Sequence, residues 1–133
     1  MNTLVSDTPR VAFFPDSYLE VNGAAMTCRR LVEYAAKEGF PFLVFHAGSE
    51  NRTVTDGSVT HFSLKRSLVN IALDEELAYD PLFERHQGKV RKMLEEFKPD
   101  VIHITGINDV SIIGSVLGNL LLVGAVMCEA SYA

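Results

Sequence analysis

A polar loop between an apolar segment and a helical pattern contains the residues best suited to chemistry. It runs from Pro15 to Gly23 and ends in Asn22-Gly23, directly before the helical pattern begins. A glycine at a helix start lets a ligand approach the backbone, and the free N–H groups together with the helix dipole favour an anion such as a diphosphate. In a second interpretation, which stays open, Gly23 serves turn geometry alone. The chain has neither a GxGxxG dinucleotide fingerprint nor the GK[ST] of a Walker P-loop.

Five strands and three helices are predicted around this loop. The apolar or alternating segments 11–14, 42–45, 59–64, 101–105 and 121–126 indicate the strands, the third being less buried or at an edge. The first helical pattern starts at Ala24 and is closed by Gly39. The second opens with Asp80 as N-cap and Pro81 in its first position, and Asp109 is expected to cap the third. We expect 48–57 to be a loop and 65–79 to be irregular.

This alternation of strands and helices predicts an α/β fold. We expect a Rossmann-like, doubly wound, mainly parallel sheet with helices on both faces, formed by residues 10–133 after a tail at 1–9. Ligands of such sheets bind outside the carboxyl ends of the strands. That rule selects three loops, at Pro15–Gly23, Ala47–Asp56 and Gly106–Asp109.

Charge and cysteine content exclude several classes of function. The formal net charge is −5, so nothing indicates a nucleic-acid partner. Cys28 and Cys128 lie far apart and form no metal-spaced cluster, which predicts no metal site and is typical of a reducing cytosol.

The uncharged stretch from Val110 to Cys128 has two interpretations. Its length approaches that of a bilayer span, and Gly114 with Gly118 forms a GxxxG pair. The alternative is a buried helix followed by a buried parallel strand, which polar interruptions such as Asn119 favour.

Two segments resemble family 4 glycosyltransferases of the GT-B fold. The string VAFFPDSYLEVNGAAMT, Val11 to Thr27, is similar to that family's opening strand, Asn-Gly loop and helix. The string KPDVIHIT, Lys98 to Thr105, is similar to its Lys-Pro-Asp-Val-(Ile/Val)-His segment. The order of the two motifs fits, and the resemblance covers roughly Arg10 to Leu117.

The resemblance implies site residues on both sides of a cleft. The backbone at Asn22, Gly23 and Ala24 would lie beside the diphosphate of a nucleotide-sugar, which is a substrate, so no cofactor is expected. Five further residues would line or approach the acceptor side: Asp16, Ser17, Tyr18, His103 and Thr105. Each has a structural alternative, such as an Asx turn at Asp16, a loop anchor at Tyr18, or a hydrogen-bonded core histidine at His103. No catalytic residue is assigned, and His46 and His61 stay unassigned because no partner is visible in sequence.

The chain also departs from the family. Where members carry a His-Thr pair after the third helix, this chain has Val123 to Ala130 without histidine. Relative to the family, we expect the second Rossmann domain to be absent and this domain to be truncated at its C-terminal end.

The resemblance therefore implies the acceptor-side half of a retaining enzyme that moves a hexose from a nucleotide-sugar to a lipid, glycan or small-molecule acceptor. Alone, this half is expected to be inactive. Its partners would be the donor, an unknown acceptor, the missing domain, and a second copy that associates through the exposed interdomain face. The alternatives are a non-catalytic Rossmann-like module for a nucleotide or partner, and a fragment anchored in a membrane by 110–128. We expect a cytoplasmic location, with a peripheral position at a membrane as the variant.

Overall fold

A six-stranded, mainly parallel sheet forms the middle layer of the fold. The computed structural model describes residues 8–16, 18–65, 71–72, 78–79, 83–106, 109–121 and 123–128. The sheet has the order β3-β4-β2-β1-β7-β8, and β3 runs antiparallel to β4 while the other neighbours pair in parallel. Its strands are β1 (Val11–Pro15), β2 (Phe42–Gly48), β3 (Arg52–Asp56), β4 (Val59–Lys65), β7 (Val101–Thr105) and β8 (Gly124–Cys128).

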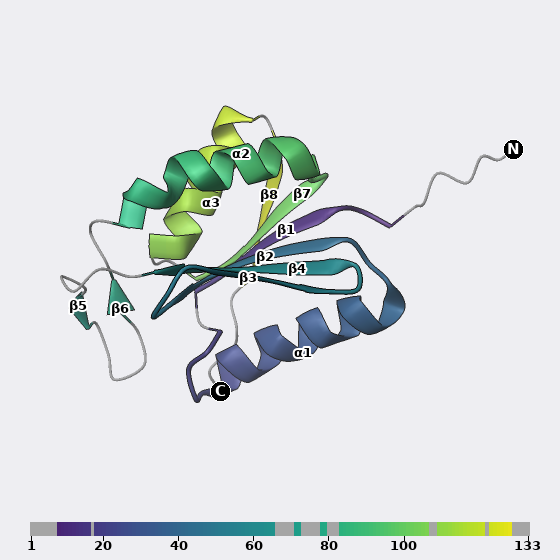
Figure 1. Cartoon of the computed structure of the whole chain (residues 1–133), viewed down its shortest axis with the longest axis horizontal. Helices are drawn as coiled ribbons and strands as arrows, with labels where there is room; N and C mark the ends of the chain where they lie inside the picture. The colour runs from purple at the N-terminus through teal and green to yellow at the C-terminus, as the bar shows by residue number, and fades with distance from the viewer. Residues whose placement is uncertain are drawn as a thin grey trace, which may run out of the picture.

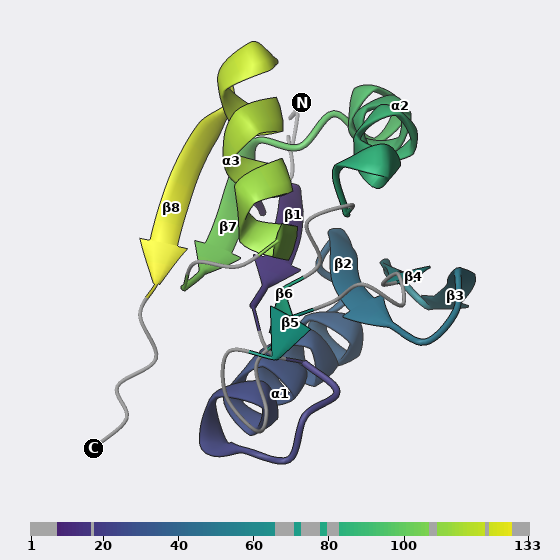
Figure 2. The ribbon, with the colours of Figure 1, turned by 90° about the vertical axis from the view of Figure 1, so that its left-hand side faces the viewer.

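Helices cover the two faces of the sheet in a way that follows from the direction of the chain. The helix α1 (Gly23–Glu38) links β1 to β2 on one face. The 3-10 turn η1 (Phe83–His86), α2 (Gln87–Phe97) and α3 (Asp109–Leu120) lie on the other face (Figures 1 and 2). The parallel neighbours of β1 are β2 on one side and β7 on the other. Because crossovers between parallel strands are right-handed, the helices on the two sides lie on opposite faces of the sheet. The predicted Rossmann-like α/β fold is confirmed.

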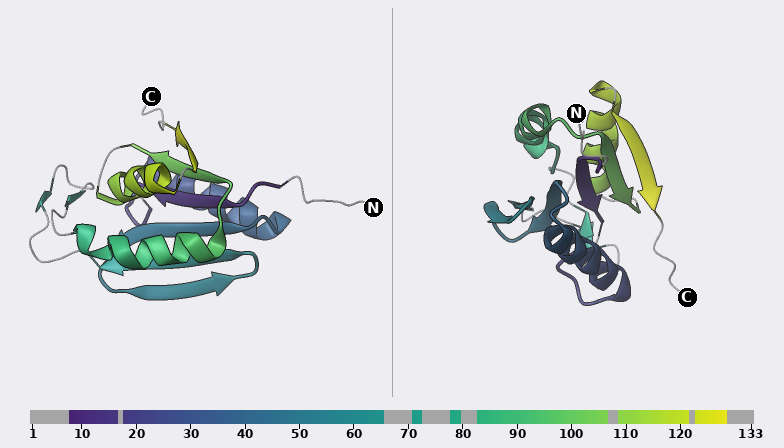
Figure 3. Two further views of the ribbon diagram at one scale, coloured as in Figure 1. Left: turned by 90° about the horizontal axis from the view of Figure 1, so that it is seen from above. Right: turned by 90° about the vertical axis from the view of Figure 1, so that its right-hand side faces the viewer.

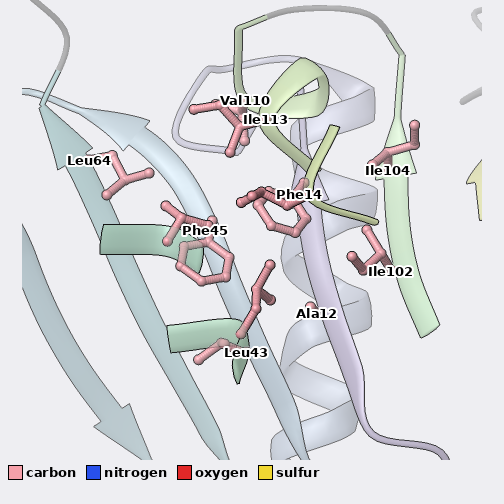
Figure 4. Close-up of a cluster of buried hydrophobic side chains, with 12 residues drawn as sticks. Ala12, Phe14, Leu43, Phe45, Leu64, Ile102, Ile104, Val110 and Ile113 are labelled. Carbon is pink, nitrogen blue, oxygen red and sulfur yellow. The ribbon is translucent and has the colours of Figure 1, made fainter. Parts of the chain in front are cut away.

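Alternating side chains of the strands form a core on each face. Ala12 and Phe14 of β1 belong to the core under α2 and α3, whereas Val11 and Phe13 belong to the core under α1. Figure 4 shows Phe14 and Phe45 side by side in the first of these cores, with ring centroids 4.8 Å apart. Such a pair adds about 0.5–1.5 kcal/mol beyond the burial of its area.

Both ends of α1 are closed as their residue types predict. The Oδ1 of Asn22 accepts the Ala25 N–H at 2.7 Å, which caps the amino end. Gly39 adopts a left-handed φ of 74° at the carboxyl end, as expected for a C-cap glycine. The helix therefore starts at Gly23, directly after the Pro15–Gly23 loop.

The outer part of the sheet differs from the prediction. Residues 52–56, expected in a loop, form β3, and 59–64 lie in an inner strand rather than an edge strand because β3 pairs with β4 beyond it (Figure 3). All five residues of β3 are exposed, so burial gives no hydrophobic signal there. The β-branched residues Thr53, Val54 and Thr55, and Gly57 with its φ of 58° in the turn, are what favour a hairpin.

Three further segments also differ from the prediction. The α-helix α2 begins at Gln87 after η1, and Asp80 and Pro81 lie outside the described residues. The segment 65–79 holds two paired two-residue strands, β5 (Ile71–Ala72) and β6 (Ala78–Tyr79). The last strand starts at Gly124 rather than at 121, because α3 continues to Leu120 and a turn follows.

Within the uncharged stretch 110–128, residues 110–120 belong to α3, which packs against the sheet, and residues 124–128 form β8, so the structure has a helix followed by a parallel strand, as the alternative interpretation expected. A Cβ on Gly114 would lie 2.8 Å from the Phe14 ring, and one on Gly118 would lie 3.3 Å from Ile102. The GxxxG pair therefore lets α3 approach the sheet closely. Within the part of the chain that the structure describes, no helix is both long enough and apolar enough to cross a membrane.

Substituting Gly114 tests this close approach. We expect Gly114→Ala to lower the free energy of unfolding by about 1–3 kcal/mol, because the new methyl group would overpack Phe14. Gly88→Ala is the matched control, since a Cβ there meets nothing within 4 Å and should stabilise α2 by up to about 1 kcal/mol. Urea denaturation of both variants measures the difference, and equal effects would contradict the packing role.

Candidate functional site

A reciprocal hydrogen-bond pair joins the carboxyl ends of β1 and β7. The Asp16 N–H donates to the Thr105 Oγ1 at 2.9 Å, and that hydroxyl donates to the Asp16 Oδ1 at 2.8 Å. Asp16 is half-buried and Thr105 is buried. Two residues that sequence reasoning placed on the acceptor side thus contact each other, although 89 positions separate them. The pair fixes the direction in which the loop leaves β1.

The chain that follows β7 is shaped around the same carboxylate. Gly106 has a φ of 69°, and a Cβ there would collide with the Asp16 carboxylate. The buried Ser111 hydroxyl of α3 donates to the Thr105 carbonyl at 3.1 Å. Glycine at 106 therefore satisfies both a left-handed backbone and a close contact, and α3 is tied to the same strand end.

The start of α1 exposes backbone where the sequence predicted an anion site. Gly23 does not have a positive φ, and a Cβ on it would meet nothing within 4 Å. Its missing side chain is therefore required neither by turn geometry nor by packing among the described residues. Asn22 caps the Ala25 N–H, and the Met26 N–H donates to the Asn22 carbonyl. The N–H groups of Gly23 and Ala24 have no acceptor in the described part of the chain.

The segment Tyr18–Glu20 of the same loop is held firmly against α1. The Tyr18 N–H donates to the Glu20 Oε2 at 2.6 Å. From α1, the Arg29 guanidinium donates to the Tyr18 carbonyl and, at 3.1 Å, to the Glu20 carbonyl. Arg29 is not among the residues that the sequence analysis selected. Its position fixes the loop that carries Tyr18.

Tyr18 packs on two histidines of the sheet. Its ring stacks on His46 of β2 with centroids 4.8 Å apart and an interplanar angle of 14°, and lies 6.3 Å from His61 of β4. Burial raises the pKa of Tyr18 to about 12, against the lowering effect of Arg29, so the phenol stays protonated at neutral pH. Burial also lowers the pKa of His46 and of His61, which favours neutral imidazoles.

A groove of about 380 Å³ lies between this loop and the β3–β4 hairpin. Its lining residues are Tyr18, Leu19, His46, Ser49, Glu50, Arg52, Val54, His61 and Ser63. Tyr18 is one of the predicted acceptor-side residues and lines the groove. Asp16 and Thr105 form the hydrogen-bonded pair, and Asn22, Gly23 and Ala24 lie at the start of α1.

His103 sits apart from these groups. It is the third residue of β7, two positions before the strand end, and its ring lies 4.9 Å from that of Phe13. Its Nε2 is buried and has no hydrogen-bond partner in the described part of the chain, so the hydrogen bond expected of a core histidine is not found there. Burial lowers its pKa. Ser17, the remaining predicted residue, lies outside the described residues.

His46 and His61 are the groove residues that sequence reasoning left unassigned. A period of two along each strand places His46 with Val44, and His61 with Val59, on the face that packs against α1. What the sequence does not reveal is that β2 and β4 are neighbours, paired so that His46 lies opposite Ser63. No group of three or more potential metal ligands occurs among the described residues.

Comparison with protein-family models finds no match to this chain. Comparison with curated proteins finds none either. The resemblance to family 4 glycosyltransferases therefore rests on the two sequence motifs.

Replacing His46 tests its buried, neutral state. Its pKa is lower in the folded protein than the ordinary value of about 6.5, so below that pH the unfolded chain binds the proton more strongly. The contribution of neutral His46 to the free energy of unfolding is therefore fully present at higher pH. It is lost as the pH falls through about 6.5, by at most about 1.4 kcal/mol per pH unit. His46→Phe keeps a ring against Tyr18 but cannot titrate. Thermal unfolding between about pH 8 and about pH 5 should show a flatter pH dependence for the variant. An unchanged slope would show that His46 is not the group responsible.

Proposed function

We propose that the chain is the amino-terminal, acceptor-side domain of a retaining glycosyltransferase of the GT-B fold. The observation that carries the proposal is the start of α1, where Gly23 and Ala24 present backbone N–H groups beside a glycine whose missing side chain nothing in the described fold requires. Helix N-termini of this kind bind phosphate groups. This one follows β1, the strand at which the sheet order reverses.

The placement of the two resembling motifs supports the proposal. The Val11–Thr27 motif forms β1, its loop and the first turns of α1, and the Lys98–Thr105 motif forms β7. These strands are direct neighbours, paired from Val11 with Val101 to Pro15 with Thr105. The motifs therefore meet at one strand edge, where ligands of open α/β sheets bind.

The proposed chemistry uses positioning and electrostatics. The parent enzyme would hold a nucleotide-sugar between this domain and a second Rossmann domain, with its diphosphate at Gly23 and Ala24. Backbone N–H groups and the helix dipole would stabilise the negative charge that develops on the leaving diphosphate. The acceptor hydroxyl would be held near the anomeric carbon, which replaces a bimolecular encounter by a positioned one. The hexose then moves to the acceptor and the nucleoside diphosphate leaves.

Nucleotide-sugar binding tests the assignment of the loop. We expect the chain to bind UDP- or GDP-sugars weakly, and Gly23→Val to reduce the affinity about tenfold or more, because the branched side chain would block approach to the backbone. Gly88→Val, in the first turn of α2, is the matched control and should leave the affinity unchanged. Calorimetric titration measures the affinity, and thermal unfolding checks that each variant folds.

The outcomes separate the alternatives. Affinity that Gly23→Val leaves unchanged would sink the anion role of the loop, and absence of nucleotide binding would sink the transferase proposal. Binding of UDP or GDP that gains nothing from the sugar would favour a non-catalytic nucleotide-binding module. Transfer of labelled hexose by this chain alone would overturn the expectation that it is one half of an active site.

A further inference from the structure

The floor of the groove beside Tyr18 is formed by two cross-strand rows of side chains, whose residues all line the groove except the buried Val44. One row runs from Arg52 of β3 through Ser63 of β4 to His46 of β2. The adjacent row runs from Val54 through His61 to Val44. Residues that pair directly across strands lie on the same face of a sheet, so both rows face the side of α1. The hairpin thus supplies half of a site whose other half is the Tyr18–Leu19 loop.

Two apolar side chains of the groove lining are exposed. Leu19 of the loop is 58% exposed and Val54 of β3 is 45% exposed, although both line the groove. The imidazole of His61 and the hydroxyl of Ser63 line the same groove. Gly48 makes room for that hydroxyl, because a Cβ on Gly48 would collide with the Ser63 Oγ. The groove therefore combines the apolar side chains of Leu19 and Val54 with the polar groups of His61 and Ser63.

The charges and size of the groove restrict the ligand. Neutral imidazoles and serine hydroxyls each offer a donor and an acceptor, so the floor suits groups that do both. The Arg52 Nη1 lies 4.0 Å from the Glu50 Oε1. Because these two charges are opposite, the groove lining has no net charge that would attract an anion or a cation. A volume of about 380 Å³ is at the low end of the range for ligand pockets, about 300–1,000 Å³.

We propose that this groove binds one neutral sugar ring of the acceptor, with its C–H faces between Leu19 and Val54 and its hydroxyl edge on His61 and Ser63. A pyranose has apolar faces and an edge of groups that each donate and accept hydrogen bonds, which matches this combination of apolar and polar side chains. The preference for a sugar over another ring of this size rests on the proposed function, in which the Tyr18 side is the acceptor side.

The site is separate from the proposed donor site. The diphosphate would contact backbone at Gly23 and Ala24, whereas none of the residues that line the groove belongs to α1. Each site can therefore be probed with its own ligand and its own amide signals.

Titration of the ¹⁵N-labelled full chain with methyl α-glycosides of glucose, mannose and galactose tests the proposal. At least one glycoside should shift the amide signals of Val54, His61 and Ser63, with a Kd on the order of 1 mM. Val54→Arg should raise that Kd about tenfold or more, because the long side chain fills the groove. Thr55→Arg is the matched control on the opposite, exposed face of β3 and should leave the Kd within about twofold. The spectrum of each variant shows whether it folds.

Uridine and inorganic phosphate serve as comparison ligands. The proposal is overturned if no glycoside shifts the groove signals, if uridine or phosphate binds there more tightly than every glycoside, or if Thr55→Arg weakens binding as much as Val54→Arg. Groove signals that respond to no glycoside while UDP-sugars shift Gly23 and Ala24 would overturn this inference and keep the proposed function. Glycoside binding in the groove without any nucleotide response at α1 would keep the sugar site and overturn the transferase assignment.

Discussion

Parallel pairing of β1 with both β2 and β7 is the constraint on which the site depends. The strands β2 and β7 lie on opposite sides of β1. Because the connections between parallel strands are right-handed, the helices that lead to these two strands lie on opposite faces of the sheet. The loops that follow β1 and β7 therefore diverge at the carboxyl ends of these strands. The loop after β1 turns toward α1, and α3 follows β7 on the other face. The Asp16–Thr105 hydrogen bonds hold the two strand ends together at the point of separation. The start of α1 and the groove both take their positions from this point.

The Tyr18–Glu20 segment of the loop is held by contacts within the fold, without a ligand. Glu20 and Arg29 hold the backbone of Tyr18, and His46 supports its ring. A ligand that binds beside such a loop does not have to order it, which removes part of the entropic cost of association. The aromatic ring of Tyr18 thus acts as a loop anchor, the structural alternative considered for it, and also forms a wall of the groove.

Local patterns predicted the local features and failed where distant segments meet. The period change after Gly23 and the glycine at 39 correctly placed α1, because a helix is determined by neighbours three and four residues apart. The strand β3 was missed because its five residues are exposed and give no hydrophobic signal, whereas it joins the sheet by pairing with β4. The Asp16–Thr105 pair and the Tyr18–His46 stack join residues whose contact depends on strand order, which a single sequence does not reveal. The start of α1 could be predicted, whereas the groove required the register of β2, β3 and β4.

The position of β3 at the border of the sheet has a consequence for self-assembly. An outer strand presents unpaired N–H and C=O groups on which another extended chain can build. The β-branched run Thr53-Val54-Thr55 is suited to such addition. Arg52 and Asp56 lie at its two ends, and the tight turn at Gly57 limits its length. The outer strand β3, which lines the groove, thus carries a charged residue at each end. A second chain that paired with β3 would have to desolvate both charges, which opposes strand-to-strand aggregation.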